Sequence, residues 1–178
     1  MEDKARALVA YPRVRLGNDN LGLCKLPWVD VFNPASGRMK DTDIYINPAS
    51  QELYADFYNG MLGTEMTWQQ IFAQTDRDIN LQRVMNVMVY GKETARQDRI
   101  PDRAVGPTDD LLYDTEKDYN DGQLALFLGK PLTDVQGMPT AEKREILMKR
   151  REEQLRELIQ VYYRARGWNS TGIRPRKR

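Results

Sequence analysis

Apolar residues between positions 47 and 63 recur at the spacing of one helical face. Asn47 followed by Pro48 is typical of a helix start, because asparagine caps the free amides and proline fits the first turn. Gly60 and Gly63 then provide stop signals. The apolar stripe consists of Leu53, Tyr54, Phe57 and Met61. The pattern predicts a short helix that begins at Pro48.

A second helical stretch follows at Thr67. Thr67 and Gln70 have the spacing of a capping box, in which each side chain bonds the other residue's backbone amide. Gly91 ends the stretch. Its apolar residues are Ile71, Phe72, Ile79, Val84, Met85 and Met88. The pattern predicts a longer helix over residues 68–89.

A third helical stretch begins after Pro139 and Thr140 and is closed by Gly167. Its apolar residues recur at helical spacing and are Leu147, Leu155, Leu158, Ile159 and Tyr162. We expect a helix over residues 141–163, and we expect this helix and the one over 68–89 to be the two longest of the chain.

Residues 92–139 have a different pattern, rich in Asp, Gly and Pro with scattered apolar positions. We interpret this segment as a loop-rich insertion with one short helix near 119–128. Strand-like alternation is limited to VDVF at 29–32 and DIYI at 43–46. The fold class we predict is mainly α, an irregular multi-helix single domain over residues 1–178 with long loops.

Composition agrees with a packed, water-soluble protein. Of the 178 residues, 40% are hydrophobic and 30% are charged, which is ordinary for a globular domain. No apolar run reaches the roughly 18 residues that span a bilayer, and the first residues lack the apolar block of a secretory signal. A single cysteine cannot form a disulfide within the chain. We therefore expect a cytoplasmic protein without a membrane partner.

Charge is unevenly distributed along the chain. Residues 141–178 carry 12 basic and 5 acidic side chains, whereas the preceding residues carry 15 basic and 21 acidic ones. In the predicted last helix the two signs alternate, as on a solvated helix face. Only in RPRKR at 174–178, within a basic tail over 169–178, do the positive charges lack neighbouring acidic residues. This pattern disfavours nucleic acid as the main partner.

The stretch DNLGLCK at 19–25 combines a carboxylate, a glycine and the single thiol of the chain. Taken alone, Cys24 fits a small buried apolar residue better than a ligand. Together the residues suggest more. Gly22 lets the backbone approach a flat ligand closely, and the two acceptor atoms of Asp19 suit a heterocycle that presents an N–H beside an NH₂ group.

These residues resemble the second D-x-x-G-L-C motif of the aldehyde:ferredoxin oxidoreductases, tungsten or molybdenum enzymes with two pterins and a [4Fe–4S] cluster. Three later blocks resemble the same family in the same order. They are LYADFYNGMLGTEMTWQQI at 53–71, NLQRVMNVMVYGKETARQDRIPDR at 80–103 and YYRARGWNSTGI at 162–173. The resemblance covers nearly the whole chain, which looks like the carboxy-terminal helical third of the longer relatives.

The resemblance implies roles for the motif residues. Cys24 is then the fourth cysteine ligand of the [4Fe–4S] cluster, and Asp19, Gly22 and Leu23 belong to a loop that holds one pterin. The other three cluster cysteines, the first D-x-x-G-L motif and an amino-terminal β domain are expected outside these 178 residues. We assign no catalytic residue to this chain, which contains no histidine.

By the same resemblance, the chain is the cofactor-enclosing domain of an enzyme that oxidises an aldehyde to its acid. Electrons would pass through the cluster to ferredoxin. The chain alone is expected to lack activity, because its partners are the remaining domains or subunits. Two alternatives stand beside this interpretation: a reductase of an aromatic thioester on the same scaffold, and a non-catalytic helical binding module with a basic tail.

Overall fold

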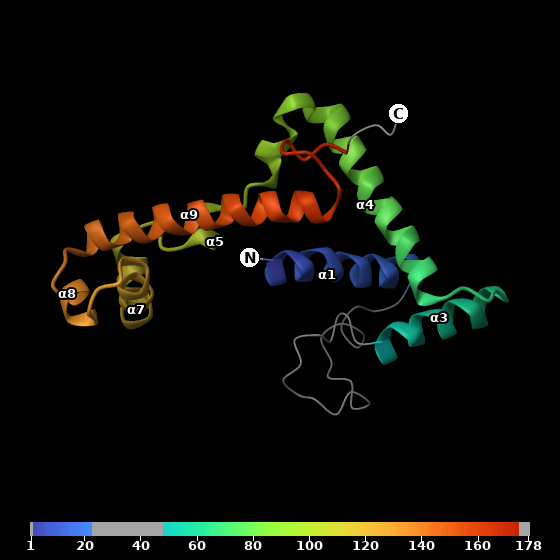
Figure 1. Ribbon diagram of the computed structural model, residues 1–178, viewed down its shortest axis with the longest axis horizontal. Coiled ribbons are helices and arrows are strands. Elements are labelled where there is room, and N and C mark those ends of the chain that lie inside the picture. Colours follow the sequence, from blue (N-terminus) through green and yellow to red (C-terminus); the bar gives the residue numbers. More distant parts are fainter. Residues whose placement is uncertain (1, 23–47, 175–178) are drawn as a thin grey trace. The chain divides into compact units, whose positions relative to one another are not determined.

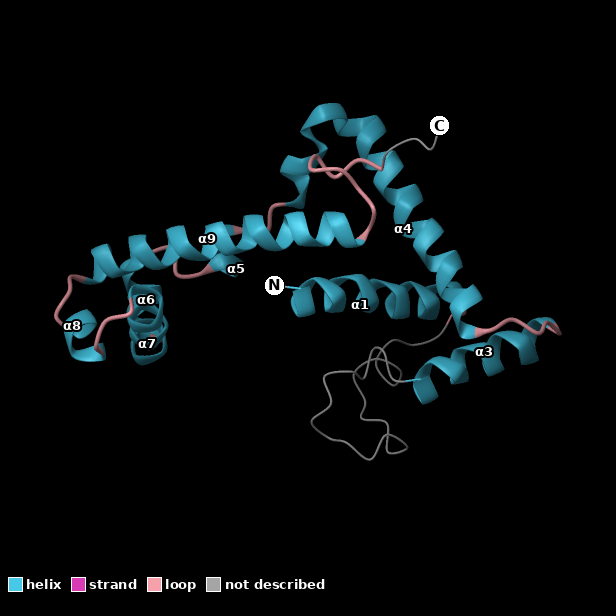
Figure 2. Ribbon diagram, in the orientation of Figure 1, coloured by secondary structure: helices cyan, strands magenta, loops and turns pink. Residues whose placement is uncertain are grey.

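The computed structural model describes residues 2–22 and 48–174, and within them helices joined by loops and turns form the structure, without a strand (Figures 1 and 2). The prediction of a mainly α fold is confirmed. The two strand candidates, at 29–32 and 43–46, lie outside the described residues. The elements are α1 (Glu2–Asn20), α3 (Pro48–Leu62), α4 (Trp68–Tyr90), the 3₁₀ helix η3 (Gly91–Asp98), α5 (Asp102–Val105), α6 (Asp110–Thr115), α7 (Lys117–Leu128), α8 (Leu132–Gln136) and α9 (Thr140–Ala165).

The predicted helix boundaries follow from local capping. The backbone amide of Thr67 donates to Oε1 of Gln70 at 2.8 Å, and the amide of Gln70 donates to Oγ1 of Thr67 at 3.4 Å. This is the expected capping box, and it begins α4. Gly63 and Gly91 both have positive φ and end α3 and α4. In the described chain α4 and α9 are the two longest helices, as predicted.

Helix α1 is not predicted by the sequence pattern. Its apolar and charged residues are spread around the helix, and Pro12 lies inside it. Proline removes one backbone hydrogen bond and usually signals a break. Packing provides the missing stabilisation, because α1 contacts α4.

The structure also differs from the expected loops in residues 92–139. Helices α5, α6, α7 and α8 all lie there. Of these, α7 is the short helix expected near 119–128, and the other three were not predicted. The Asp and Gly residues that suggested loops act as helix caps. Oδ1 of Asp109 accepts from the amide of Leu112 at 2.8 Å at the start of α6, and Gly129, with φ of 62°, ends α7.

The chain divides into two compact units. Unit 1 comprises residues 1–94 and 161–178, and unit 2 comprises residues 95–160. Helix α9 contributes its last turns to unit 1 and the rest to unit 2. The single domain over 1–178 stays a prediction.

Unit 1 has a small aromatic core between α3 and α4. Tyr54, Ala55, Ile71 and Phe72 are buried there. The ring of Phe72 meets the rings of Tyr54 and Trp68 edge to face, with centroids 6.0 and 5.6 Å away. Such aromatic pairs stabilise the fold beyond the contribution of the buried apolar area. This core supports the end of α1, because Tyr11 and Leu21 pack against it.

Unit 2 has a core that includes a buried ion pair. Nζ of Lys143 lies 2.7 Å from Oδ1 of Asp121, and both side chains are 1% exposed. The hydroxyl of Tyr113 donates to the same oxygen at 2.8 Å. The apolar residues Leu124, Val135 and Leu147, together with Tyr113, are fully buried.

Candidate functional site

The predicted cofactor motif begins at the carboxyl end of α1. Asp19 lies in the last turn of this helix, so the expectation of a loop position for Asp19 is wrong. The amide of Gly22 donates to the carbonyl of Asp19 at 3.1 Å, and Gly22, with φ of 66°, forms the turn that follows. Asp19 and Gly22 are both exposed. Leu23 and Cys24 lie outside the described residues.

Contacts from distant parts of the sequence hold this end of α1. Nδ2 of Asn20 donates to Oδ2 of Asp78 on α4 at 2.9 Å. The hydroxyl of Tyr54 on α3 donates to Oδ1 of the fully buried Asn18 at 2.7 Å. Burial raises the pKa of Tyr54 to about 12. The last turn of α1 is therefore fixed on two sides.

Sequence reasoning missed this supporting set. Asn18 directly precedes the motif, but its partner Tyr54 is 36 residues away, and no local signal links them. Nδ2 of Asn18 has no hydrogen-bond partner among the described residues. A buried donor without an acceptor is costly, so an acceptor beside this amide would stabilise the end of α1.

The residues present fit a pterin better than they fit a cluster. Asp19 presents an exposed carboxylate at the carboxyl end of α1, and carboxylate oxygens are acceptors that suit the N–H and NH₂ groups of a pterin. Among the described residues, no atom lies within 4 Å of a Cβ built on Gly22, so none of them fills the space beside this turn. For a cubane, which normally takes four thiolates, the chain provides one cysteine. In the described residues no group of three or more His, Cys, Asp or Glu side chains is placed to hold a metal ion.

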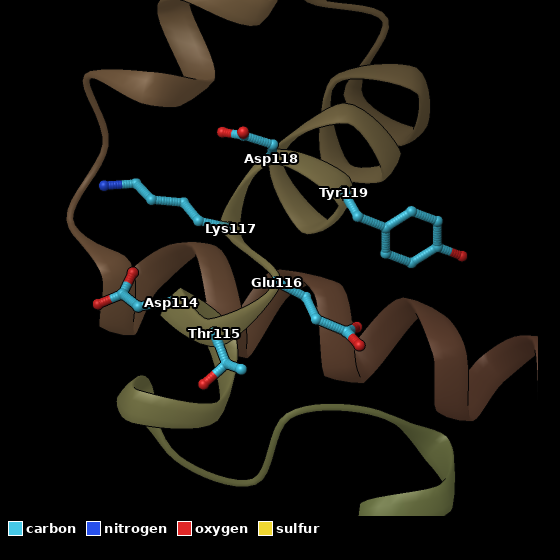
Figure 3. A pocket seen from close by; sticks show the side chains of 6 residues that line it. All are labelled: Asp114, Thr115, Glu116, Lys117, Asp118 and Tyr119. Atoms are coloured by element: carbon cyan, nitrogen blue, oxygen red, sulfur yellow. The ribbon is translucent and has the colours of Figure 1, made fainter.

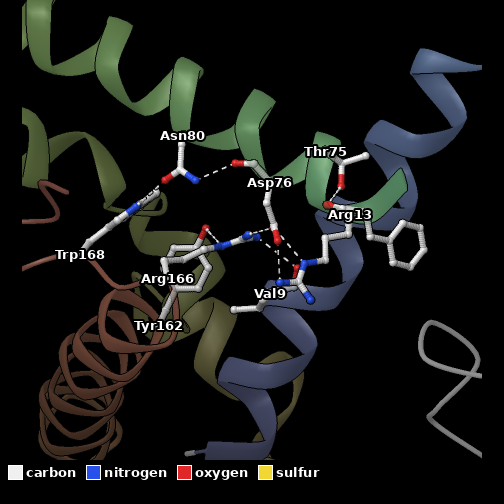
Figure 4. A network of polar contacts seen from close by, with 9 residues as sticks. Val9, Arg13, Thr75, Asp76, Asn80, Tyr162, Arg166 and Trp168 are labelled. Atoms are coloured by element: carbon white, nitrogen blue, oxygen red, sulfur yellow. Dashed lines mark hydrogen bonds and ion pairs between the residues drawn. The ribbon is translucent and has the colours of Figure 1, made fainter. Parts of the chain in front are cut away.

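A carboxylate on α4 ties α1 to the carboxy-terminal segment (Figure 4). Asp76 accepts from Nε and Nη2 of Arg13 at 2.9 and 2.7 Å. It also accepts from Nη1 of Arg166 at 2.8 Å, and Nη2 of Arg166 donates to the carbonyl of Val9 at 3.1 Å. The side chain of Arg166 is 4% exposed. The carboxylate of Asp76 therefore compensates the positive charge of the buried Arg166 guanidinium.

Two of the blocks that carry the family resemblance meet in unit 1. Nε1 of Trp168 donates to Oδ1 of Asn80 at 3.0 Å. Nε of Arg83 donates to the carbonyl of Gly172 at 2.6 Å, and its guanidinium carbon lies 4.8 Å from the centroid of the Trp168 ring. The block at 80–103 thus begins with a polar face that binds the block at 162–173.

A depression of about 540 Å³ lies on the surface of unit 2, where α6 meets α7. Six consecutive residues line it, Asp114, Thr115, Glu116, Lys117, Asp118 and Tyr119. Their side chains point in different directions (Figure 3). Because no pair of them converges on one point, the depression does not have the arrangement of an acid–base site.

Among the described residues, no helix has the length and apolar character that a membrane crossing requires.

A family model described as aldehyde ferredoxin oxidoreductase, domains 2 & 3, matches residues 1–178. No curated protein and no solved structure matches the chain.

Proposed function

Because this chain belongs to the aldehyde ferredoxin oxidoreductase family over its whole length, we propose that it is the carboxy-terminal, cofactor-enclosing domain of a tungsten- or molybdenum-dependent aldehyde oxidoreductase. The observation that carries this proposal is the family match to all 178 residues. The exposed carboxylate and glycine turn at the end of α1 support it, because the family resemblance assigns a pterin to these residues.

In this proposal the motif residues bind and orient the cofactor. Asp19 accepts hydrogen bonds from the N–H and NH₂ groups of one pterin, and Gly22 allows the ring to approach the backbone. Leu23 completes the pterin loop, and Cys24 supplies one of the four thiolates of the [4Fe–4S] cluster. When bound, the metal and its pterins supply the oxidation of the aldehyde, and the cluster carries electrons to ferredoxin.

The remaining domains or subunits of the enzyme supply the other ligands. A cluster held by one thiolate would be open on three sides. The chain therefore acts as one wall of the cofactor site and excludes water from it. A wall of this kind serves a thioester reductase equally well, so assays with an aldehyde and with an aromatic thioester distinguish these two substrate classes.

Two variants of the complete enzyme test the proposal. Asp19→Asn replaces a carboxylate acceptor with an amide that also donates, and we expect it to lower the tungsten or molybdenum content. Cys24→Ser is expected to lower the iron content. Asp56→Asn is the matched control, because Asp56 is an exposed carboxylate on α3 outside the motif. Metal analysis beside thermal unfolding gives the readout. Normal metal content with lowered stability in both motif variants would mean that these residues serve packing only.

A further inference from the structure

The second half of α4 has an apolar face that the described chain does not cover. Its residues have the spacing i, i+3, i+4, i+7 and i+8 that places side chains on one side of a helix. They are Leu81, Val84, Met85, Met88 and Val89, with exposed fractions of 60%, 50%, 57%, 80% and 73%. We call these five residues the α4 stripe.

Unit 1 uses a different face of α4 for its own packing. The buried residues of the helix are Ile71, Phe72, Thr75, Ile79 and Arg83. In the second half of the helix this buried face is polar, since Asn80 and Arg83 bind Trp168 and Gly172. The α4 stripe therefore contributes nothing to the core of unit 1.

Between its two ends, the α4 stripe has no exposed charged residue of α4 beside it. Between Leu81 and Tyr90 the sequence contains one charged residue, Arg83, and its side chain is buried. Gln82 and Asn86, which border the stripe, are uncharged. Depletion of charge with methionine enrichment is typical of the centre of a protein interface. A solvated helix face would carry charged residues instead.

We propose that the α4 stripe is the docking surface for the remaining part of the oxidoreductase, which presents an apolar helix face or groove to it. This inference rests on the proposed function, in which the chain is one wall of a cofactor site completed by other domains. The stripe lies within the block at 80–103 that resembles the family, so the same segment binds unit 1 with its polar face and the rest of the enzyme with its apolar face.

The size of the α4 stripe favours this occupant over a second copy of the chain. Nine helical residues span about 12 Å, and five aliphatic side chains bury on the order of 500 Å². A stable interface between freely diffusing proteins buries about 800 Å² on each partner. A domain held in the same assembly needs less area, because its effective concentration is of order millimolar.

The test uses this chain and the metal-free remainder of the same enzyme, produced as a separate polypeptide that carries the first D-x-x-G-L motif and the other cluster cysteines. Binding is measured by titration of the labelled chain with the remainder at concentrations up to about 1 mM, which matches the effective concentration in the intact assembly. We expect the double variant Met85→Lys/Met88→Lys to weaken binding at least 10-fold, because it places two ammonium groups in an apolar contact. Its thermal unfolding should match that of the wild type, since both side chains are exposed.

Leu126→Lys is the matched control. Leu126 on α7 is 77% exposed, similar to Met88 at 80%, but lies in unit 2. We expect this variant to bind as the wild type does. If Met85→Lys/Met88→Lys binds equally well, or if the wild type fails to bind, the inference is overturned, and the metal analysis of Cys24→Ser still decides the proposed function separately. A dimer of the chain alone that the double variant abolishes would assign the stripe to a second copy and likewise overturn the inference.

Discussion

Nε of Arg83 donates to the carbonyl oxygen of Gly172 at 2.6 Å, joining positions 89 residues apart. The approach is close enough to exclude any side chain at position 172. A Cβ there would lie 2.0 Å from Nη2 of Arg83 and 2.8 Å from Cζ of Tyr163, and the φ of Gly172 is 72°. The glycine is therefore required both by space and by backbone conformation.

Replacing this glycine should destabilise unit 1. We expect Gly172→Ala to lower the free energy of unfolding by at least about 2 kcal/mol, because it combines a strained backbone with a displaced guanidinium. Thermal or denaturant unfolding measures the change. Gly122→Ala is the control, since Gly122 lies inside α7 and a Cβ there meets nothing within 4 Å. This control should stabilise by about 0.5–1 kcal/mol, and equal effects of the two variants would contradict the contact.

Breaking the buried ion pair of unit 2 should cost more than breaking an exposed one. Lys143→Met leaves the carboxylate of Asp121 buried without a counter-charge, and we expect a loss of about 3–5 kcal/mol. The double variant Lys143→Met/Asp121→Asn removes both charges and keeps an acceptor for Tyr113, so most of the loss should be recovered. Chemical unfolding of the four proteins in this cycle measures the coupling.

An exposed pair on α9 provides the control for that cycle. Arg150 and Glu153 are 3.4 Å apart and about half exposed. Arg150→Met should change stability by no more than about 0.5 kcal/mol. Additive effects in the Lys143 and Asp121 cycle would show that the two buried charges act independently, against this account.

Alkaline pH should weaken the contact that supports the end of α1. Burial raises the pKa of Tyr54 from 10.0 to about 12, so the native state favours the neutral phenol. The resulting stabilisation is complete below about pH 10 and is lost as the pH rises through 12. We expect the melting temperature of Tyr54→Phe to fall less steeply than that of the wild type between pH 10 and 12. Parallel curves for the two proteins would refute a raised pKa. Near pH 7 the variant should lose about 1 kcal/mol, because Asn18 loses its donor.

The features that the sequence predicts are those with local causes. Thr67 and Gln70 are three residues apart, so the start of α4 can be recognised without tertiary information. The additional short helices within 92–139 were not predicted for a related reason. Asp and Gly occur both in loops and as helix caps, so residues such as Asp109 and Gly129 do not by themselves distinguish short capped helices from loops.

The candidate site likewise has a part that the sequence predicts and a part that it does not. Asp19 and Gly22 are recognised from a short motif, but the contacts that fix them are not. Asn18 binds Tyr54, and Asn20 binds Asp78 at a separation of 58 residues. Contacts at that range depend on how α1, α3 and α4 pack. The apolar periodicity of the sequence does not predict this packing.

The position of Asp76 has a consequence for the order of folding during translation. Its partners Arg13 and Arg166 lie near opposite ends of the chain. Residues 95–160 leave the ribosome before Arg166 does, and domains generally fold as units once they emerge. Unit 2 can therefore begin to form its core before the cation that pairs with Asp76 in unit 1 has emerged. The helices α1 and α4 must wait for this contact until Arg166 has left the ribosome.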